Sequence, residues 1–288
     1  MKTRPIVHRV ASELSQNAFK YDIDTHKDDP KLPGVFVFCG SRGSGKTYAC
    51  VQMCKHFEDQ GYTSRTFLIS PTCKSNSIYQ NLSTLSYNDI CEEDKYFQLF
   101  LHHIVGEVKK DWKEFNDYKA YAKIYVRYRR GDPFLTIKEM GEIEKRGGAP
   151  PKPVKRPSHM LIVDDAQGTD LYTTCRKDLM SHCTIKHRHI PLSICFLMQS
   201  WMGLPRVIRL NGTHFLLYKT NDKRQLEQIY SAFGNHVTWD QFYAMYQQAT
   251  SNAHGFLYID TNPKSDETRF RNGFNEYFIN KSDEEKVV

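Results

Sequence analysis

Eight residues near position 40 have the types and the spacing of a phosphate-binding loop. Residues 40 to 47 run Gly-Ser-Arg-Gly-Ser-Gly-Lys-Thr and match the pattern G-x-x-x-x-G-K-[ST]. Its glycines let the backbone turn tightly enough to point several N–H groups at one phosphate chain, where the positive end of the following helix also lies. Lys46 is placed to reach the β- and γ-phosphates, and the Thr47 hydroxyl is placed to bind Mg²⁺. The predicted phosphate cradle consists of Gly40, Ser41, Arg42, Gly43, Ser44, Gly45, Lys46 and Thr47.

The segments on either side are those that such a loop requires. The apolar run at residues 35 to 39 predicts a strand before the loop, and residues 47 to 60 have the period of a helix after it. This context argues against a chance turn of Gly and Ser. ATP and Mg²⁺ are therefore the predicted cofactors.

Three polar residues end two further apolar runs. Asp164 and Asp165 follow the run at residues 160 to 163, and Gln199 follows the run at residues 192 to 198. We expect Asp164 to hold the Mg²⁺ shell, Asp165 to polarise the attacking water, and Gln199 to orient that water or sense the γ-phosphate. Glutamate is commoner at the second acidic position, so a more distant acid or a water relay stays open as the base. The alternatives are acids that only cap a strand and a glutamine that only ends one.

The order of apolar runs predicts an α/β fold. Strands that alternate with helices and are apolar throughout indicate a P-loop NTPase with a mostly parallel sheet and helices on both faces. Polar residues at the strand ends would then gather at the carboxyl edge, where ligands bind. Further strands are expected at residues 65–70, 213–218 and 255–259, and helices at 171–186, 223–233 and 239–248. Whether the last of these extend the sheet or build a subunit interface stays open.

The ATPase domain is expected at residues 33–280, with an N-terminal extension at 1–32, a basic insertion at about 91–157 and a flexible tail at 281–288. Arg269 and Arg271 are expected to add to a basic surface. The chain is 40% hydrophobic, so it can build a core, and we expect no membrane span. The first 30 residues lack the apolar segment of a secretory signal, which favours a cytosolic compartment. The eight cysteines are expected to be free thiols, with a zinc site or disulfides as the alternative.

The insertion carries most of the net charge. Residues 106 to 157 hold 14 Lys and Arg against 8 Asp and Glu, which is +6 of the chain's +7. Aromatic and basic residues alternate there at helical spacing, which would suit contact with DNA phosphates and bases. In the alternative, the rings pack on the protein and the basic residues form a solvated face. Residues 147 to 153, rich in Gly and Pro, are expected to be a mobile linker back to the sheet.

The motifs, in their order along the chain, resemble those of the genome-packaging ATPases of nucleocytoplasmic large DNA viruses, which include poxvirus-like enzymes. These belong to the FtsK-HerA group of P-loop ATPases. The resemblance covers about residues 33 to 220. It rests on the phosphate-binding loop, Ile69-Ser-Pro-Thr72, Leu161-Ile-Val-Asp-Asp165, Arg188-His189, Gln199 and Pro205-Arg-Val-Ile-Arg-Leu-Asn211.

The resemblance implies a homo-oligomeric ring that couples ATP hydrolysis to moving double-stranded DNA into a capsid. It also implies a capsid or portal-type partner, and a location in the host cytoplasm at the site of virus assembly or on the virion. In such rings a basic residue of one subunit completes the active site of the next. Arg188 is the first candidate for this residue and Arg209 the second, with a surface ion pair as the alternative for each. A DNA helicase or transfer ATPase, a small-molecule kinase and a nucleotide switch remain alternative functions.

Overall fold

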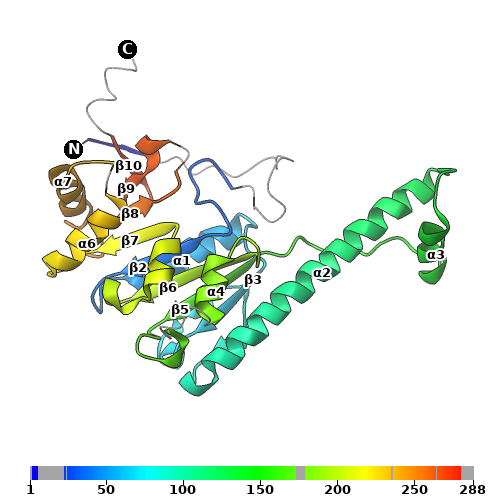
Figure 1. Ribbon diagram of the computed structural model, residues 1–288, viewed down its shortest axis with the longest axis horizontal. Coiled ribbons are helices and arrows are strands. Elements are labelled where there is room, and N and C mark those ends of the chain that lie inside the picture. Colours follow the sequence, from blue (N-terminus) through cyan, green and yellow to red (C-terminus); the bar gives the residue numbers. More distant parts are fainter. Residues whose placement is uncertain are drawn as a thin grey trace, which may run out of the picture. The chain divides into compact units, whose positions relative to one another are not determined.

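The computed structural model describes residues 2–5, 23, 25–172, 179–234, 236–263 and 265–279 (Figure 1). The chain divides into two compact units. The first comprises residues 1–102 together with 158–288, and the second comprises residues 103–157. The second unit lies within the basic insertion expected at residues 91–157. The predictions for the tail at 281–288, for Cys175 and for most of the N-terminal extension concern residues outside the described part of the chain.

A ten-stranded sheet forms the centre of the first unit, in the order β1-β10-β9-β8-β7-β2-β6-β5-β3-β4. Strands β7, β2, β6, β5, β3 and β4 pair in parallel, and the pairs from β7 through β8, β9 and β10 to β1 are antiparallel. The strands are β1 (Lys2–Pro5), β2 (Val35–Cys39), β3 (Arg65–Ile69), β4 (Leu85–Cys91), β5 (His159–Asp164), β6 (Leu192–Met198), β7 (His214–Tyr218), β8 (Phe256–Asp260), β9 (Phe270–Asn272) and β10 (Glu276–Ile279). The prediction of a mostly parallel sheet is confirmed.

The C-terminal strand left open by the sequence extends this sheet. β8 pairs antiparallel with β7, from His214 opposite Asp260 to Tyr218 opposite Phe256. The chain between these two strands contains α6 and α7. Because β8 is antiparallel to β7, the turn before β8 lies at the carboxyl edge of β7, beside the phosphate-binding loop.

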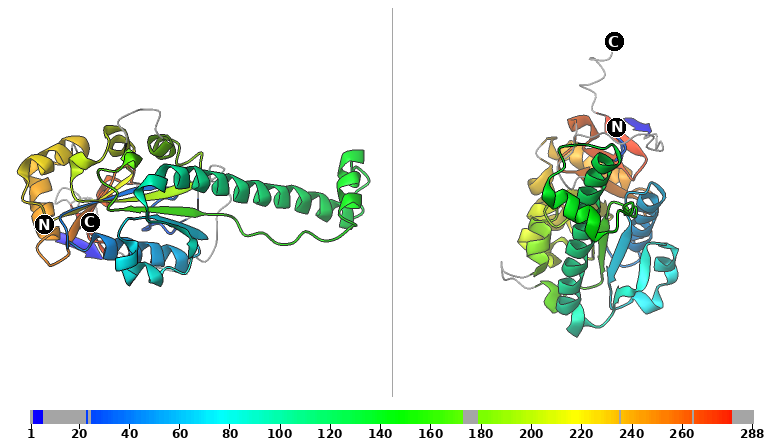
Figure 2. Two further views of the ribbon diagram at one scale, coloured as in Figure 1. Left: turned by 90° about the horizontal axis from the view of Figure 1, so that it is seen from below. Right: turned by 90° about the vertical axis from the view of Figure 1, so that its right-hand side faces the viewer.

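Helices cover both faces of the sheet (Figure 2). On one face, α1 packs on a core that alternates along the strands, with Phe36 and Phe38 of β2 facing the helix and fully buried. On the other face, Phe215 of β7 stacks on Phe233 of α6. The helices of the first unit are α1 (Lys46–Asp59), α4 (Leu179–Ile185), α5 (Arg206–Asn211), α6 (Lys223–Phe233) and α7 (Trp239–Ala249), and α2 (Phe97–Arg129) begins in it.

One expectation for the first unit is tested only in part and another is corrected. The helix predicted over residues 171–186 agrees with α4 over Leu179–Ile185, a short 3-10 turn lies at Asp170–Tyr172, and residues 173–178 are outside the described part of the chain. Arg269 and Arg271 are buried rather than part of a basic surface, and the Arg271 guanidinium lies over the rings of Tyr258 and Tyr277. Among the described residues, no helix is long and apolar enough to cross a membrane.

The second unit contains most of the 33-residue helix α2, the short helix α3 (Ile137–Lys145) and an extended segment that follows it. A capping box of Thr136 and Glu139 begins α3. This extended segment, residues 147–157, is called the returning segment. It lies along α2: the Tyr121 hydroxyl donates a hydrogen bond to the carbonyl of Ala149 at 2.7 Å, and the Arg156 guanidinium lies over the Trp112 ring. Residues 147–153 therefore run beside α2 with Ala149 hydrogen-bonded to it, and their mobility stays a prediction.

The aromatic residues of α2 explain this packing. Trp112 and Tyr121 are buried, and the Arg146 guanidinium lies 4.2 Å from the centre of the Tyr121 ring. These two rings pack against the returning segment and are not free to stack on nucleic-acid bases. The packing alternative is therefore confirmed for these two, and both alternatives stay open for the rings that are half-buried or exposed, which are Phe115, Tyr118, Tyr125 and Tyr128.

Candidate nucleotide-binding site

The loop between β2 and α1 has the backbone that its glycines were expected to provide. Gly43 has φ 77° and Gly45, the N-cap residue of α1, has φ 96°, values that residues with a side chain rarely adopt. The Lys46 ammonium donates hydrogen bonds to the carbonyls of Gly40 and Ser41, each at 2.8 Å. The first residue of α1 is thus held over the loop, at the positive end of the helix dipole.

Asp164 meets the loop at the end of β5. Its Oδ2 accepts a hydrogen bond from the Thr47 hydroxyl at 3.3 Å and another from the Tyr79 hydroxyl at 2.5 Å. Asp164 is buried, and burial raises its pKa, while the two hydrogen bonds and Lys46 oppose the rise. A carboxylate and a hydroxyl this close together are hard oxygen ligands of the kind that Mg²⁺ prefers, so Thr47 and Asp164 fit the predicted metal role.

Asp165 and Gln199 lie side by side at the same edge. The Gln199 Nε2 donates a hydrogen bond to Asp165 Oδ1 at 3.1 Å, and both side chains are exposed. Asp165 has φ 52°, an uncommon conformation for a residue with a side chain and one often found at functional sites. The structure thus brings together an acid and an amide, which can together orient a water molecule.

The charged side chains at this edge of the sheet influence one another's pKa values. Burial lowers the pKa of Lys46, and the carboxylates of Asp164 and Asp165 oppose that lowering. Both acids are therefore close enough to the ammonium to stabilise its charge. Ser44 Oγ is buried and makes no hydrogen bond within the described structure, so this loop hydroxyl is available to a phosphate oxygen. Ser41 and Arg42 are exposed.

The candidate arginines lie elsewhere. Arg188 is exposed in the turn before β6 and makes no hydrogen bond or ion pair with any described residue. Since β6 is parallel to β2, the start of β6 lies at the opposite edge of the sheet from the phosphate-binding loop. Arg188 is therefore not positioned to act on the site of its own chain.

The Arg209 side chain is held by contacts with residues of its own chain. Its Nε donates a hydrogen bond to the carbonyl of Leu204 at 3.1 Å, and its guanidinium lies 5.5 Å from the centre of the Trp201 ring. Burial lowers its pKa, and the neighbouring Arg206 adds to this effect. These contacts give Arg209 a structural role, whereas Arg188 is the freer of the two.

Two residues of the site were missed by the sequence reasoning. Tyr79, on the 3-10 turn Ser77–Asn81, is buried at 4% exposure, and no spacing rule ties it to Asp164, 85 residues later. His254, with φ 64°, lies against the loop, because a Cβ added to Gly45 would lie 3.0 Å from its Cβ. Tyr79 lies a few residues after Ile69-Ser-Pro-Thr72, which ends a strand at the carboxyl edge of the sheet. This proximity is the one feature of the sequence that pointed to a place near the site.

Replacing Tyr79 with phenylalanine is expected to weaken Mg²⁺ binding without removing activity. Burial raises the pKa of Tyr79, so the hydroxyl stays protonated and donates to Asp164. Loss of such a supporting hydrogen bond typically costs 10- to 100-fold in metal affinity or activity. The Mg²⁺ concentration for half-maximal ATP hydrolysis should rise by about that factor. Tyr62→Phe, which removes a hydroxyl bonded to Asp29, is the matched control. Equal Mg²⁺ dependence in both variants would show that Tyr79 has no part in the site.

A parallel sheet with this loop, an acidic strand end and a polar neighbouring strand end at one edge defines the fold of a P-loop ATPase. No protein-family model matches the chain, and no curated protein matches it in sequence.

Solved structures do match. The DNA-packaging ATPase B204 from Sulfolobus turreted icosahedral virus is similar over 86% of this chain and 98% of that chain, at 13% identity and a TM-score of 0.50. EssC (ATPases 2 and 3) from Geobacillus thermodenitrificans is similar over 95% of this chain and 47% of that chain, at 12% identity and a TM-score of 0.48. The likeness to B204 confirms the predicted fold class.

Proposed function

We propose that this protein hydrolyses ATP in order to move double-stranded DNA, and that it packages a viral genome into a capsid. The observation that carries the proposal is the convergence of Lys46, Thr47, Asp164, Asp165 and Gln199 at one edge of the sheet. The solved structure of similar fold is described as a DNA-packaging ATPase. A related B204 structure is described as a complex with ATP-gammaS.

In this proposal each residue of the site has one task. The loop and Lys46 bind the triphosphate, and Thr47 and Asp164 hold Mg²⁺, which neutralises charge on the phosphates. Asp165 polarises the attacking water, and Gln199, hydrogen-bonded to it, orients that water or senses the γ-phosphate. Arg188 of one subunit would reach the site of a neighbour, which accords with its exposed place away from its own loop. The working state is then a homo-oligomeric ring on a capsid or portal-type protein, in the host cytoplasm or on the virion.

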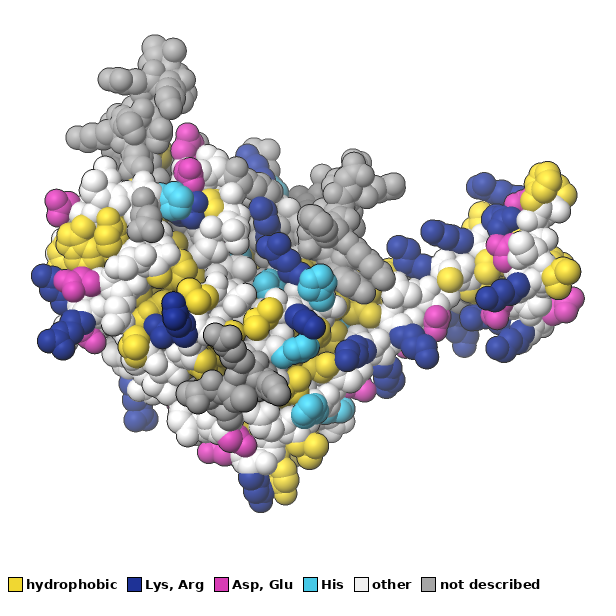
Figure 3. Space-filling model, viewed as in Figure 1, with side chains coloured by type: hydrophobic (Ala, Val, Ile, Leu, Met, Phe, Trp, Pro, Cys, Tyr) yellow, Lys and Arg dark blue, Asp and Glu magenta, His cyan; other side chains and the backbone are white. Residues whose placement is uncertain are grey.

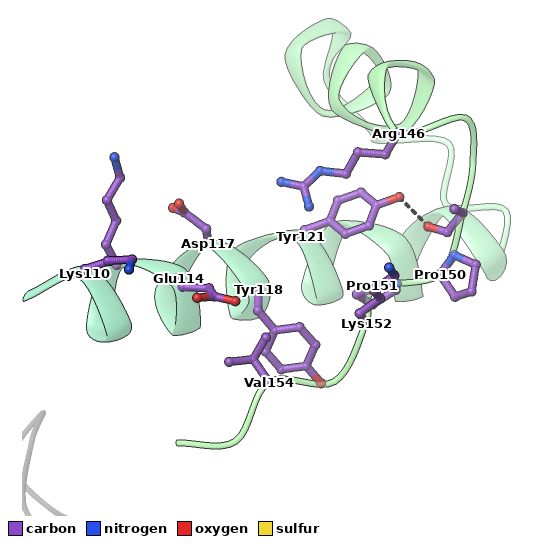
Figure 4. Close-up of a pocket in the computed structure, with 12 residues that line it drawn as sticks. Lys110, Glu114, Asp117, Tyr118, Tyr121, Arg146, Pro150, Pro151, Lys152 and Val154 are labelled. Atoms are coloured by element: carbon purple, nitrogen blue, oxygen red, sulfur yellow. Dashed lines mark hydrogen bonds between the residues drawn. The ribbon is translucent and has the colours of Figure 1, made fainter. Parts of the chain in front are cut away.

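The second unit supplies the DNA-binding surface. Its 14 basic residues are exposed except for Arg127, which is paired with Asp132 and Glu139 (Figure 3). The pocket in Figure 4, between α2 and the returning segment, has a volume of about 500 Å³, and its charged lining residues are Lys110, Lys113, Glu114, Asp117, Arg146 and Lys152. Such a surface binds the phosphate backbone without reading sequence, as a motor that travels along DNA requires.

Charge removal on α2 and at Arg130, the residue after it, tests this surface. In the variant Lys119→Gln/Lys123→Gln/Arg130→Gln, the slope of log affinity for duplex DNA against log salt should become less negative by about 3, since each lost phosphate contact contributes about 1. ATP hydrolysis without DNA should not change. The control Lys55→Gln/Lys74→Gln/Lys223→Gln removes the same charge from exposed positions of the first unit. If both variants lose affinity equally, net charge rather than the second unit determines DNA binding.

ATP hydrolysis with and without long duplex DNA, over a range of protein concentrations, tests the function. Turnover that rises with protein concentration and with duplex supports a ring motor that acts on DNA. A rate of ATP hydrolysis that is the same with and without DNA would favour a small-molecule kinase. Nucleotide binding without hydrolysis would favour a nucleotide switch. Unwinding of a duplex with a single-stranded tail would indicate a helicase.

A further inference from the structure

Three cysteines from two elements meet in the core behind the phosphate-binding loop. Cys50 and Cys54 lie one helical turn apart on α1, and Cys195 lies on β6. Their sulfur atoms are all within 4.8 Å of one another, and the side chains are 0%, 1% and 0% exposed. The sequence analysis expected free thiols and left a zinc site open, because the spacing of these cysteines matches no common ligand pattern.

The potential metal ligands in this cluster are sulfur atoms, which are soft ligands. A fourth sulfur is close, since the Cys195 thiol points to the Met160 thioether at 3.6 Å. Thiolate and thioether ligands favour Cu(I) among biological metals, whereas structural zinc takes four thiolate or imidazole ligands. We propose that Cys50, Cys54 and Cys195 form a binding site for one soft metal ion, Cu(I), with the Met160 thioether beside it.

The distances suit a metal with little rearrangement. A metal–sulfur bond of about 2.3 Å in a trigonal or tetrahedral site places the sulfurs about 4 Å apart. Separations of at most 4.8 Å therefore need to contract by less than about 1 Å. The two ligands on α1 are at i and i+4, which places them on one face of the helix toward β6.

The buried position of the three cysteines determines how Cu(I) can bind. The Cu(I) ion offsets one of the thiolate charges, which would be costlier to bury without it. Because the three side chains are enclosed, the ion enters through a local opening of the fold, so loading should be slow. Binding should release protons, since thiols bind metal as thiolates.

Anaerobic titration of the reduced full-length chain with Cu(I), against a competing colorimetric chelator, tests the proposal. One equivalent should bind per chain. Cys50→Ala and Cys195→Ala should each weaken binding by more than the roughly 10- to 100-fold that loss of a supporting partner costs. Cys183→Ala removes a thiol that is also fully buried, on α4, and should bind like the unmodified chain.

Two further readouts keep the test independent of variant stability. Cu(I) should raise the melting temperature of the unmodified chain and of Cys183→Ala, but not that of Cys50→Ala. X-ray absorption of the loaded chain should show sulfur neighbours alone. Oxygen or nitrogen neighbours, equal loss in Cys183→Ala, or tighter binding of Zn²⁺ than of Cu(I) in a parallel titration would overturn the proposal. None of these outcomes bears on the ATPase function.

Discussion

Lys46→Ala is expected to reduce ATP hydrolysis by about 10³-fold, the effect of removing one well-placed group that stabilises charge in the transition state. Lys46 begins α1, its ammonium is bonded to two loop carbonyls, and the nearby Asp164 and Asp165 support its charge. Without it, the negative charge that develops on the transferring phosphoryl group has no cation from the loop. The turnover rate at saturating ATP is the measurement.

Lys55→Ala is the matched control for this loss. Lys55 lies on the same helix, but it is exposed and paired with Asp59 at 2.8 Å. Its replacement should change stability little, because surface ion pairs are screened by solvent, and should leave the rate unchanged. A Lys46→Ala rate within tenfold of the unmodified protein, roughly 1.4 kcal/mol in the barrier, would mean that the loop does not carry out the chemistry.

Asp164→Asn is expected to lower the rate by about 10²- to 10³-fold at ordinary Mg²⁺ concentrations, on the scale of a lost electrostatic group in an active site. The change keeps the shape of the side chain, and its oxygen can still accept the Tyr79 and Thr47 hydrogen bonds. It removes the charge that Mg²⁺ requires. Excess Mg²⁺ should therefore restore part of the activity, which a titration of rate against Mg²⁺ will show.

Asp165→Asn separates the roles of the two acids. If Asp165 polarises the water, this variant lowers the turnover rate and leaves the Mg²⁺ dependence unchanged. If a more distant acid or a water relay is the base, the rate falls only slightly. A shift in Mg²⁺ dependence for Asp165→Asn, with none for Asp164→Asn, would reverse the assignment of the two residues.

Much of this edge of the sheet was predictable from the sequence. The strand predicted at 192–198 and the helix predicted at 223–233 agree with β6 and α6 to the residue, because buried parallel strands are continuous apolar runs and α6 begins after the N-cap residue Asp222 and ends before Gly234. Asp164 and Gln199 follow such strands directly. Their common edge follows from parallel pairing alone.

Other elements were not predictable, for physical reasons. β4 is an edge strand whose Ser86, Tyr87 and Asn88 are exposed, so its sequence lacks the apolar run of a central strand. Tyr79 and His254 reach the loop through tertiary packing, which no local pattern encodes. On α2, the rings of Trp112 and Tyr121 alternate with basic residues, and this pattern is the same whether the rings pack on the protein or face a ligand. Only the position of the returning segment shows that these two rings pack on the protein.

Displacement of a third strand from duplex DNA tests the central claim of translocation most directly. A triplex-forming oligonucleotide is bound to a long duplex, and its release is followed with ATP, at protein concentrations where duplex stimulates hydrolysis. The account predicts ATP-dependent release without separation of the duplex strands, and no release by Lys46→Ala. Hydrolysis stimulated by duplex without any release of the third strand would contradict it.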